Sequence, residues 1–95
     1  MANKESPDVK DRLEQWARSK WSLEGILLRY AQLEGSKLGG SKGLDLSNAD
    51  FFHANLSAAN LMKVDLSRSR MNQVDIRGAN LLALHSRGAK LDKMD

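Results

Sequence analysis

The sequence repeats every five residues from Leu44 to Lys93, and this period constrains the fold more than any other feature. Of the ten units, nine have a sizeable apolar residue in the third place, nine have an apolar and mostly small residue in the first place, and seven have Asp or Asn in the second place. A helix repeats every 3.6 residues and a strand every 2, so a period of five requires a backbone that turns once per unit. Asp and Asn suit such turns because their side chains bond nearby backbone groups.

These units, such as ANLSA at 54–58 and VDLSR at 64–68, resemble the pentapeptide-repeat family. The resemblance implies a mainly β solenoid: a right-handed quadrilateral β-helix of about two and a half coils, with four units per coil. It also implies that the third-place residues point inward and form the core. The predicted core columns contain Leu46, Phe51, Leu56, Leu61, Leu66, Met71, Ile76, Leu81 and Leu91.

The residues before the repeat are predicted to be helical. Residues 1–6 read as a disordered tail, and Ser6 with Pro7 forms a helix-start signal. Apolar residues at spacings of three, four and seven then predict an amphipathic helical segment over 7–35, as one long or two short helices, with Gly35 as its C-terminal cap. Residues 36–43 are rich in Gly, Ser and Lys and are predicted to be a flexible linker before the repeat domain at 44–93.

Composition excludes several classes of protein. The chain has 95 residues, a net charge of +3 and no cysteine, so it has no disulfide and no thiolate metal site. The charge is mixed, without the dense basic patch expected for direct nucleic-acid binding. No apolar run is long enough to span a membrane, and the N-terminus is too polar for a secretory signal. We expect a cytoplasmic protein, with a secreted effector lacking a recognisable signal as the alternative.

No set of residues with catalytic spacing is found, and the chain is therefore not expected to be an enzyme. His53 and His85 would lie on different walls of the coil, which disfavours a metal site. Asp45 and Asp65 would be stacked, but repeated turn residues explain them better than a catalytic carboxylate pair. No cofactor is expected.

Binding surfaces are expected where outward residues are apolar. The candidate surface for a protein partner, or for the docking of the chain's own helix, contains Trp16, Trp21, Phe52, Met62 and Leu82. The helix could cap the coil, dimerise it or dock on a partner. The last units weaken, with Ser86 in a core place, so the C-terminal edge is a candidate homodimer interface containing Leu84, Leu91 and Met94. The alternative is that the repeat continues in a longer protein of which this chain is a fragment.

Three functions follow from this reading. The first is a non-enzymatic protein-interaction or scaffold module. The second comes from the resemblance, because some family members imitate duplex DNA and bind DNA gyrase or topoisomerase; the net positive charge and short length of this chain weigh against it. The third is a targeting or adaptor domain of a larger bacterial assembly or secreted effector.

Overall fold

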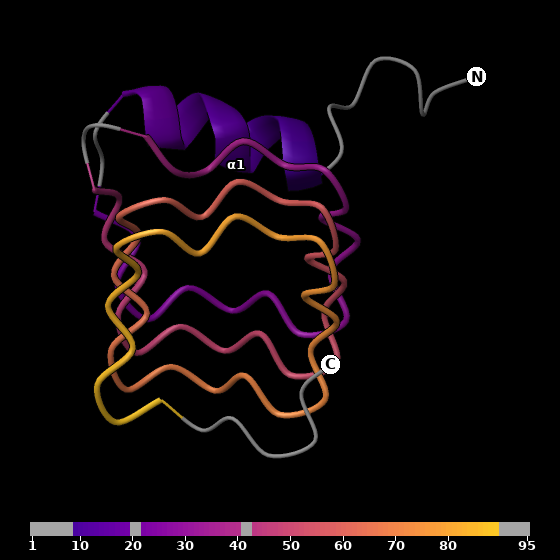
Figure 1. The fold of residues 1–95 in the computed structure, drawn as a ribbon, viewed down its shortest axis with the longest axis vertical. Helices are drawn as coiled ribbons and strands as arrows, with labels where there is room; N and C mark the ends of the chain where they lie inside the picture. The colour runs from indigo at the N-terminus through magenta and orange to yellow at the C-terminus, as the bar shows by residue number, and fades with distance from the viewer. Residues whose placement is uncertain (1–8, 20–21, 41–42, 90–95) are drawn as a thin grey trace.

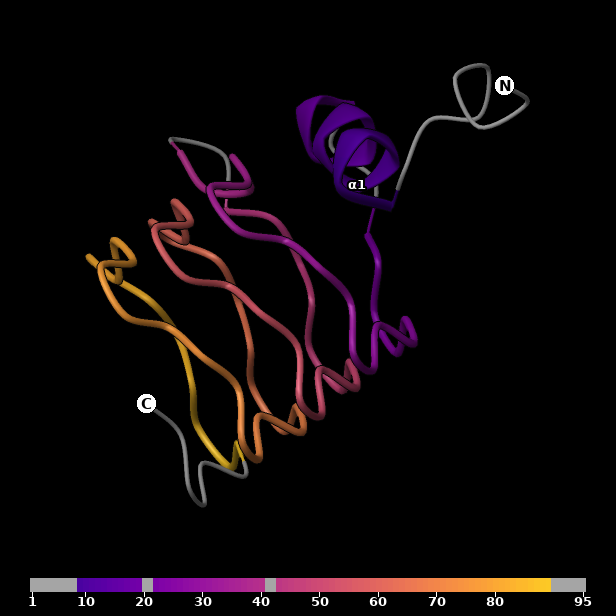
Figure 2. The same cartoon turned by 90° about the vertical axis from the view of Figure 1, so that its right-hand side faces the viewer.

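A β-helix with a short helix across its N-terminal end forms the architecture of this chain (Figures 1 and 2). The computed structural model describes residues 9–19, 22–40 and 43–89. The backbone turns at every fifth residue, and residues twenty apart lie side by side from Asp45 onward. Parallel bridges of this spacing join Asp45 to Asp65, Asp50 to Arg70, Asn55 to Asp75, Asn60 to Asn80 and Asp65 to His85. Four five-residue units therefore complete one coil.

The β-helix begins one coil earlier than the sequence analysis predicts. Residues 22–40 form a coil whose Leu27, Gln32 and Lys37 make parallel bridges to Asp50, Asn55 and Asn60 of the next coil. The bridge spacing here is 23 rather than 20, because residues 41–43 are inserted between the two coils. The prediction of a helical segment as far as residue 35 and a flexible linker at 36–43 is therefore wrong for the described part of 22–40.

The physical reason for this error is an overlap of two patterns. Leucines at 23, 28, 33 and 38 recur every five residues, but with the apolar residues between them they also resemble a helical face. Gly35, predicted to cap a helix, instead occupies the fifth place of a unit with φ of 72°. Gly39 lies so close to the next coil that a β-carbon would fall 2.2 Å from the Met62 backbone nitrogen. The coil geometry therefore requires glycine at position 39, which was predicted to lie in a flexible linker.

The core is a continuous column of third-place side chains. Leu28, Leu33 and Leu38 of the first coil lie in the same buried cluster as the predicted core residues. Among the latter, Ile76 is half-buried, Leu81 is 38% exposed and Leu91 lies outside the described residues. The core therefore weakens toward the C-terminal end. The predicted core residues that are buried are Leu46, Phe51, Leu56, Leu61, Leu66 and Met71.

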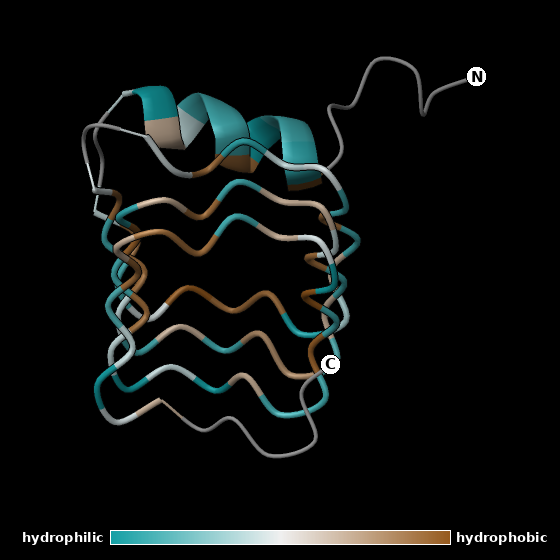
Figure 3. Ribbon diagram, in the orientation of Figure 1, coloured by the Kyte–Doolittle hydropathy of each residue, from teal (hydrophilic) through white to brown (hydrophobic). Residues whose placement is uncertain are grey.

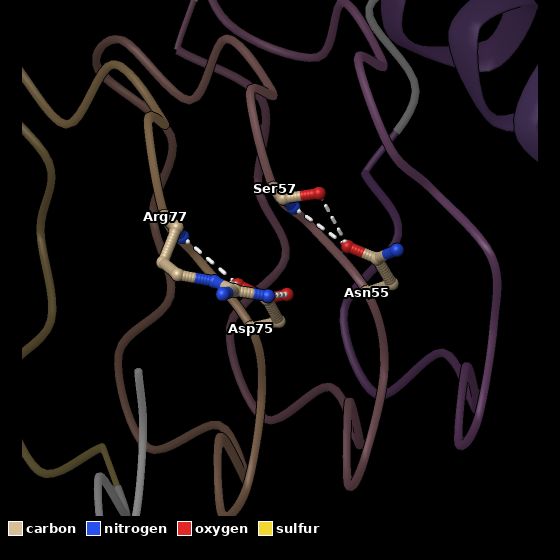
Figure 4. A network of polar contacts seen from close by, with 4 residues as sticks. All are labelled: Asn55, Ser57, Asp75 and Arg77. Atoms are coloured by element: carbon tan, nitrogen blue, oxygen red, sulfur yellow. Dashed lines mark hydrogen bonds and ion pairs between the residues drawn. The ribbon is translucent and has the colours of Figure 1, made fainter.

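Seven turns are held by a bond from a second-place Asp or Asn side chain. In all seven units with Asp or Asn in the second place, its Oδ1 accepts a hydrogen bond from the fourth-place backbone N–H. In Figure 4, Asn55 accepts from Ser57 at 2.9 Å and Asp75 from Arg77 at 3.1 Å. The fifth-place residue has a positive φ in every described unit, including non-glycine residues such as Ala58 at 58°. This turn chemistry is what the Asp/Asn pattern predicts.

Helix α1 (Val9–Arg18) covers the N-terminal end of the core. Leu13 is fully buried in the core cluster, and Trp16 and Ala17 are partly buried against it. The Glu14 Oε2 accepts a hydrogen bond of 2.8 Å from the Lys37 backbone N–H. Hydrophilic residues dominate the rest of α1 (Figure 3). Residues 23–33, predicted to lie in the helical segment that could cap the coil, instead belong to the coil that α1 caps.

Within the described parts of the chain, no helix is long and apolar enough to cross a membrane.

The cap can be tested by truncating Leu13. Leu13→Ala should lower the free energy of unfolding by about 2–5 kcal/mol, because the side chain is fully buried against the end of the core. Val9→Ala, on the same helix but 38% exposed, is the matched control and should cost far less. Urea unfolding followed by circular dichroism measures both. Equal losses for the two variants would contradict a capping role for Leu13.

Two buried first-place serines differ in their bonding. Ser36 and Ser69 are both fully buried. The Ser69 hydroxyl donates to the Leu66 carbonyl at 2.7 Å, whereas the Ser36 hydroxyl has no partner among the described residues. Ala59 and Ala79 occupy the same column as Ser36 in the following coils, so this site accommodates a methyl group.

The serine pair predicts opposite changes in stability. Ser36→Ala should raise the free energy of unfolding by about 1 kcal/mol, because a buried unpaired hydroxyl is removed. Ser69→Ala should lower it by roughly 0.5–1.5 kcal/mol, because a satisfied hydrogen bond is lost. Thermal unfolding of both variants measures the difference, and a shift in the same direction for both would refute this assignment of the two hydroxyls.

Candidate functional site

Three rings and a guanidinium group meet on the outside of the coil. Tyr30 stacks on His53 with centroids 5.4 Å apart and planes 17° apart. Phe52 lies edge-on to both, with centroids 5.7 Å from Tyr30 and 5.1 Å from His53. The Arg29 guanidinium carbon lies 4.9 Å from the Phe52 centroid and 6.0 Å from that of Tyr30, within range of a cation–π interaction. We call Arg29, Tyr30, Phe52 and His53 the ring cluster.

The coil brings these residues together because fourth and fifth places form its corners. Units 26–30 and 49–53 are adjacent, since Leu27 bridges Asp50 and the Tyr30 N–H donates to the Phe52 carbonyl at 2.8 Å. Tyr30 and His53 are both in the fifth place with φ of 62°, a conformation that costs a side chain other than glycine about 1–2 kcal/mol. Gly25 and Gly35 occupy the fifth places on either side of Tyr30. Tyr30 thus occupies a place where its own coil otherwise uses glycine.

The Asp50 carboxylate contacts two members of the ring cluster. Asp50 accepts the Phe52 N–H at 3.0 Å through Oδ1, and its Oδ2 lies 3.5 Å from the Arg29 Nε. The carboxylate thereby joins the turn to the guanidinium that covers Phe52. Because these groups hold one another, the exposed rings are pre-organised for contact.

Two further outward residues share this side of the coil. Leu27 is 76% exposed, and Arg70 is exposed in the same column, with Asp50 between them. Arg70 is the one second-place residue from 45 to 80 that is neither Asp nor Asn. We call units 26–30, 49–53 and 69–73 the aromatic face. Its outward residues include aromatic, basic and large apolar side chains, whereas outward places elsewhere in the repeat are often Ser, Asn or Ala.

The predicted surface residues do not form one site. Phe52 belongs to the ring cluster, while Trp16 is half-buried beside a surface cavity that Ile26, Leu27 and Leu28 also line. Met62 is half-buried and Leu82 is 66% exposed, at successive fourth places of a different corner. Helix α1 lies across the end of the coil instead of along that corner (Figure 2). Trp21 lies outside the described residues.

At the C-terminal edge, apolar side chains surround a cavity of about 170 Å³. Leu84, one of the three predicted edge residues, lines it and is half-buried. The other two, Leu91 and Met94, lie outside the described residues. Leu81, also in the lining, is 38% exposed.

The histidine and carboxylate residues discussed in the sequence analysis lie on different faces of the coil or are engaged in its turns. No group of three or more His, Cys, Asp or Glu side chains that could hold a metal ion occurs among them. His53 is in the ring cluster, whereas His85 bridges Asp65 on another face. Asp45 is engaged in its own turn, where bonds from the Ser47 hydroxyl and N–H and from the Ser22 hydroxyl lower the pKa of the carboxyl, with a contribution from the charge of Arg68.

Sequence reasoning missed Leu27, Arg29 and Tyr30 as surface residues because it placed them on a helix. The signal that could have found them is the continuation of the five-residue leucine pattern to Leu28 and upstream of it. Arg70 is visible in the sequence as a break in the second-place pattern.

Comparisons with known proteins agree with this geometry. Residues 45–81 match the family model for pentapeptide repeats, with eight copies. The crystal structure of a pentapeptide repeat protein from Nostoc Pcc 7120 is similar to the chain, with a TM-score of 0.75 and 28% identity over 92% of this chain and 74% of that one. The family model and this structure imply a right-handed β-helix. Searching the curated proteins yields no match.

A second similar structure is that of the pentapeptide repeat protein Rfr23 from the cyanobacterium Cyanothece 51142. It has 29% identity and a TM-score of 0.47, over 78% of this chain and 50% of that one.

Acid should destabilise the fold partly through Asp75. Bonds from the Arg77 guanidinium and N–H lower the pKa of Asp75 to about 2, below its ordinary value near 3.8. Asp75 therefore stabilises the fold above about pH 4, and this contribution is lost as the pH falls from about 4 to about 2. Asp75→Asn keeps the turn acceptor, as Asn55 does one coil earlier, and should flatten the fall in melting temperature over this range. Identical pH profiles for the two proteins would contradict this role.

Proposed function

Because the chain belongs to the pentapeptide-repeat family, as its five-residue motif predicts, we propose that it is a non-enzymatic binding module that holds a protein partner on its aromatic face. The observation that carries this proposal is the exposed ring cluster. Its rings lie on the outside of a coil whose core is already complete, so packing of the fold does not account for them. A scaffold, targeting or adaptor role is compatible with the same surface, and we propose a cytoplasmic location.

The physical properties of the ring cluster suit a protein interface. Tyr and Arg are among the residues that contribute most to binding when a partner excludes water from them. Tyr30 is 60% exposed and Leu27 is 76% exposed, so a partner would bury substantial apolar surface. The contacts among the rings, Arg29 and Asp50 reduce the entropy that would be lost on binding.

A second candidate function, DNA mimicry that binds gyrase or topoisomerase, is less well supported than the binding module. It requires a row of carboxylates that present their charge to the partner. In this chain Asp45, Asp50, Asp65 and Asp75 each direct Oδ1 to a backbone N–H of their own turn. Lys63, Arg68 and Arg77 are exposed at corners of the same coils.

A homodimer through the C-terminal edge is a further proposal, independent of the aromatic face. The apolar cavity lined by Leu81 and Leu84 supports it, because a second copy would cover the exposed end of the core. Leu91 and Met94 are proposed to contribute to the same edge. Light scattering distinguishes the two surfaces, since variants in the ring cluster should leave this self-association unchanged.

Photo-crosslinking in cells of the native host tests the binding surface. p-Benzoylphenylalanine at Gln73, directly below His53, should crosslink a protein partner, and the same group at Ala58 should not. Both positions are exposed fifth places with φ near 60°, so the pair is matched. Tyr30→Ser with Phe52→Ser should abolish the crosslink from position 73 while the coil stays folded by circular dichroism. Equal crosslinking from both positions, or a crosslink that survives the double change, would reject the aromatic face as the binding surface.

A further inference from the structure

Arg70 interrupts the turn pattern at the aromatic face. Seven Asp or Asn side chains in the second place accept the fourth-place N–H of their own unit. A guanidinium has donors only, so Arg70 cannot accept the Asn72 N–H in this way. The bond that the other units gain, about 0.5–1.5 kcal/mol, is absent from this turn. Stability of the turn therefore does not explain why arginine occupies position 70.

The charge of Arg70 is not neutralised by the described part of the chain. Asp50 is its bridge partner, but the two Asp50 oxygens are directed to the Phe52 N–H and to Arg29. The aromatic face thus has two arginines against one carboxylate that is already engaged. With a neutral His53 the described charges of the face sum to +1, from Arg29, Arg70 and Asp50. An approaching carboxylate would meet a cation with free donors.

The positions of the apolar and basic groups set the spacing of a ligand. Leu27, Asp50 and Arg70 occupy the same column of three successive coils. With strands about 4.8 Å apart, Leu27 and Arg70 are separated by roughly 10 Å. A peptide in the extended polyproline II conformation rises about 3.1 Å per residue and has three residues per turn, so side chains about three residues apart lie on one face and cover this distance. Tyr30 and Phe52 lie beside the upper part of the column.

We propose that the aromatic face binds an acidic peptide segment of a protein partner, in which a carboxylate reaches Arg70 and an apolar side chain about three residues away packs on Leu27 and Tyr30. The apolar contact supplies burial, and the carboxylate selects acidic over basic segments. This inference rests on the proposed function and adds the chemistry of the partner to it.

A random dodecapeptide library displayed on phage and selected against the full chain tests the inference. Enriched peptides should contain Asp or Glu about three residues from Leu, Ile, Phe or Met. A resynthesised enriched peptide should bind Arg70→Asn at least roughly fivefold more weakly by fluorescence anisotropy, because a charge-assisted contact is lost. Arg68→Asn, which removes the same charge at another corner, should bind as the unaltered protein does.

The Arg70→Asn change separates binding from folding. Asn restores the acceptor for the Asn72 N–H, so this variant should melt at a higher temperature while it binds more weakly. Lack of enrichment, enrichment of basic peptides, or equal affinity of Arg70→Asn would each overturn the acidic ligand. A crosslink from Gln73 together with any of these results would leave the binding surface in place and reject only its chemistry; loss of both would reject the proposed function as well.

Discussion

The repeat from 44 to 83 depends on one bond, which joins a second-place side chain to the backbone two residues later in seven of its eight units. Seven Asp or Asn residues supply it, and each converts an extended segment into a corner that begins the next face. Once corners recur every five residues, the ladder between coils and the inward columns follow. The hydrophobic core is therefore a consequence of where the chain turns, and packing refines an arrangement that local polar chemistry has already set.

Units with the full motif could be predicted from sequence, because each place has a single physical task. Leu56 fills the core, Asn55 makes the turn and Ala54 fits a narrow first place. The first coil was not predicted, because Leu27, Gln32 and Lys37 occupy second places where the turn bond is absent. Its leucines then fit a helix as well as a coil. Only the bridges to Asp50, Asn55 and Asn60 distinguish the two structures, and these contacts join residues 23 apart.

The same limitation applies to the candidate site. Phe52 could be identified as an exposed aromatic residue, because its unit lies inside the clear repeat. Its partner Tyr30 is 22 residues earlier in the sequence and becomes a neighbour only through the first coil. The insertion at 41–43 shifts the register, so spacing alone could not align the two rings. The family resemblance predicts the core residues and the turns. It does not predict the ring cluster, whose residues are specific to this chain.

The position of α1 also bears on how copies of this chain can assemble. A β-helix has two ends of different structure, and a stack whose ends both remain open can join head to tail without limit, as heterologous contacts do. Leu13 and Glu14 occupy the N-terminal end, so that end is withdrawn from such growth. Association through the remaining end can bring only like ends together. Such a contact would have two-fold symmetry and would close at two copies, so end-to-end growth into a fibre would stop there.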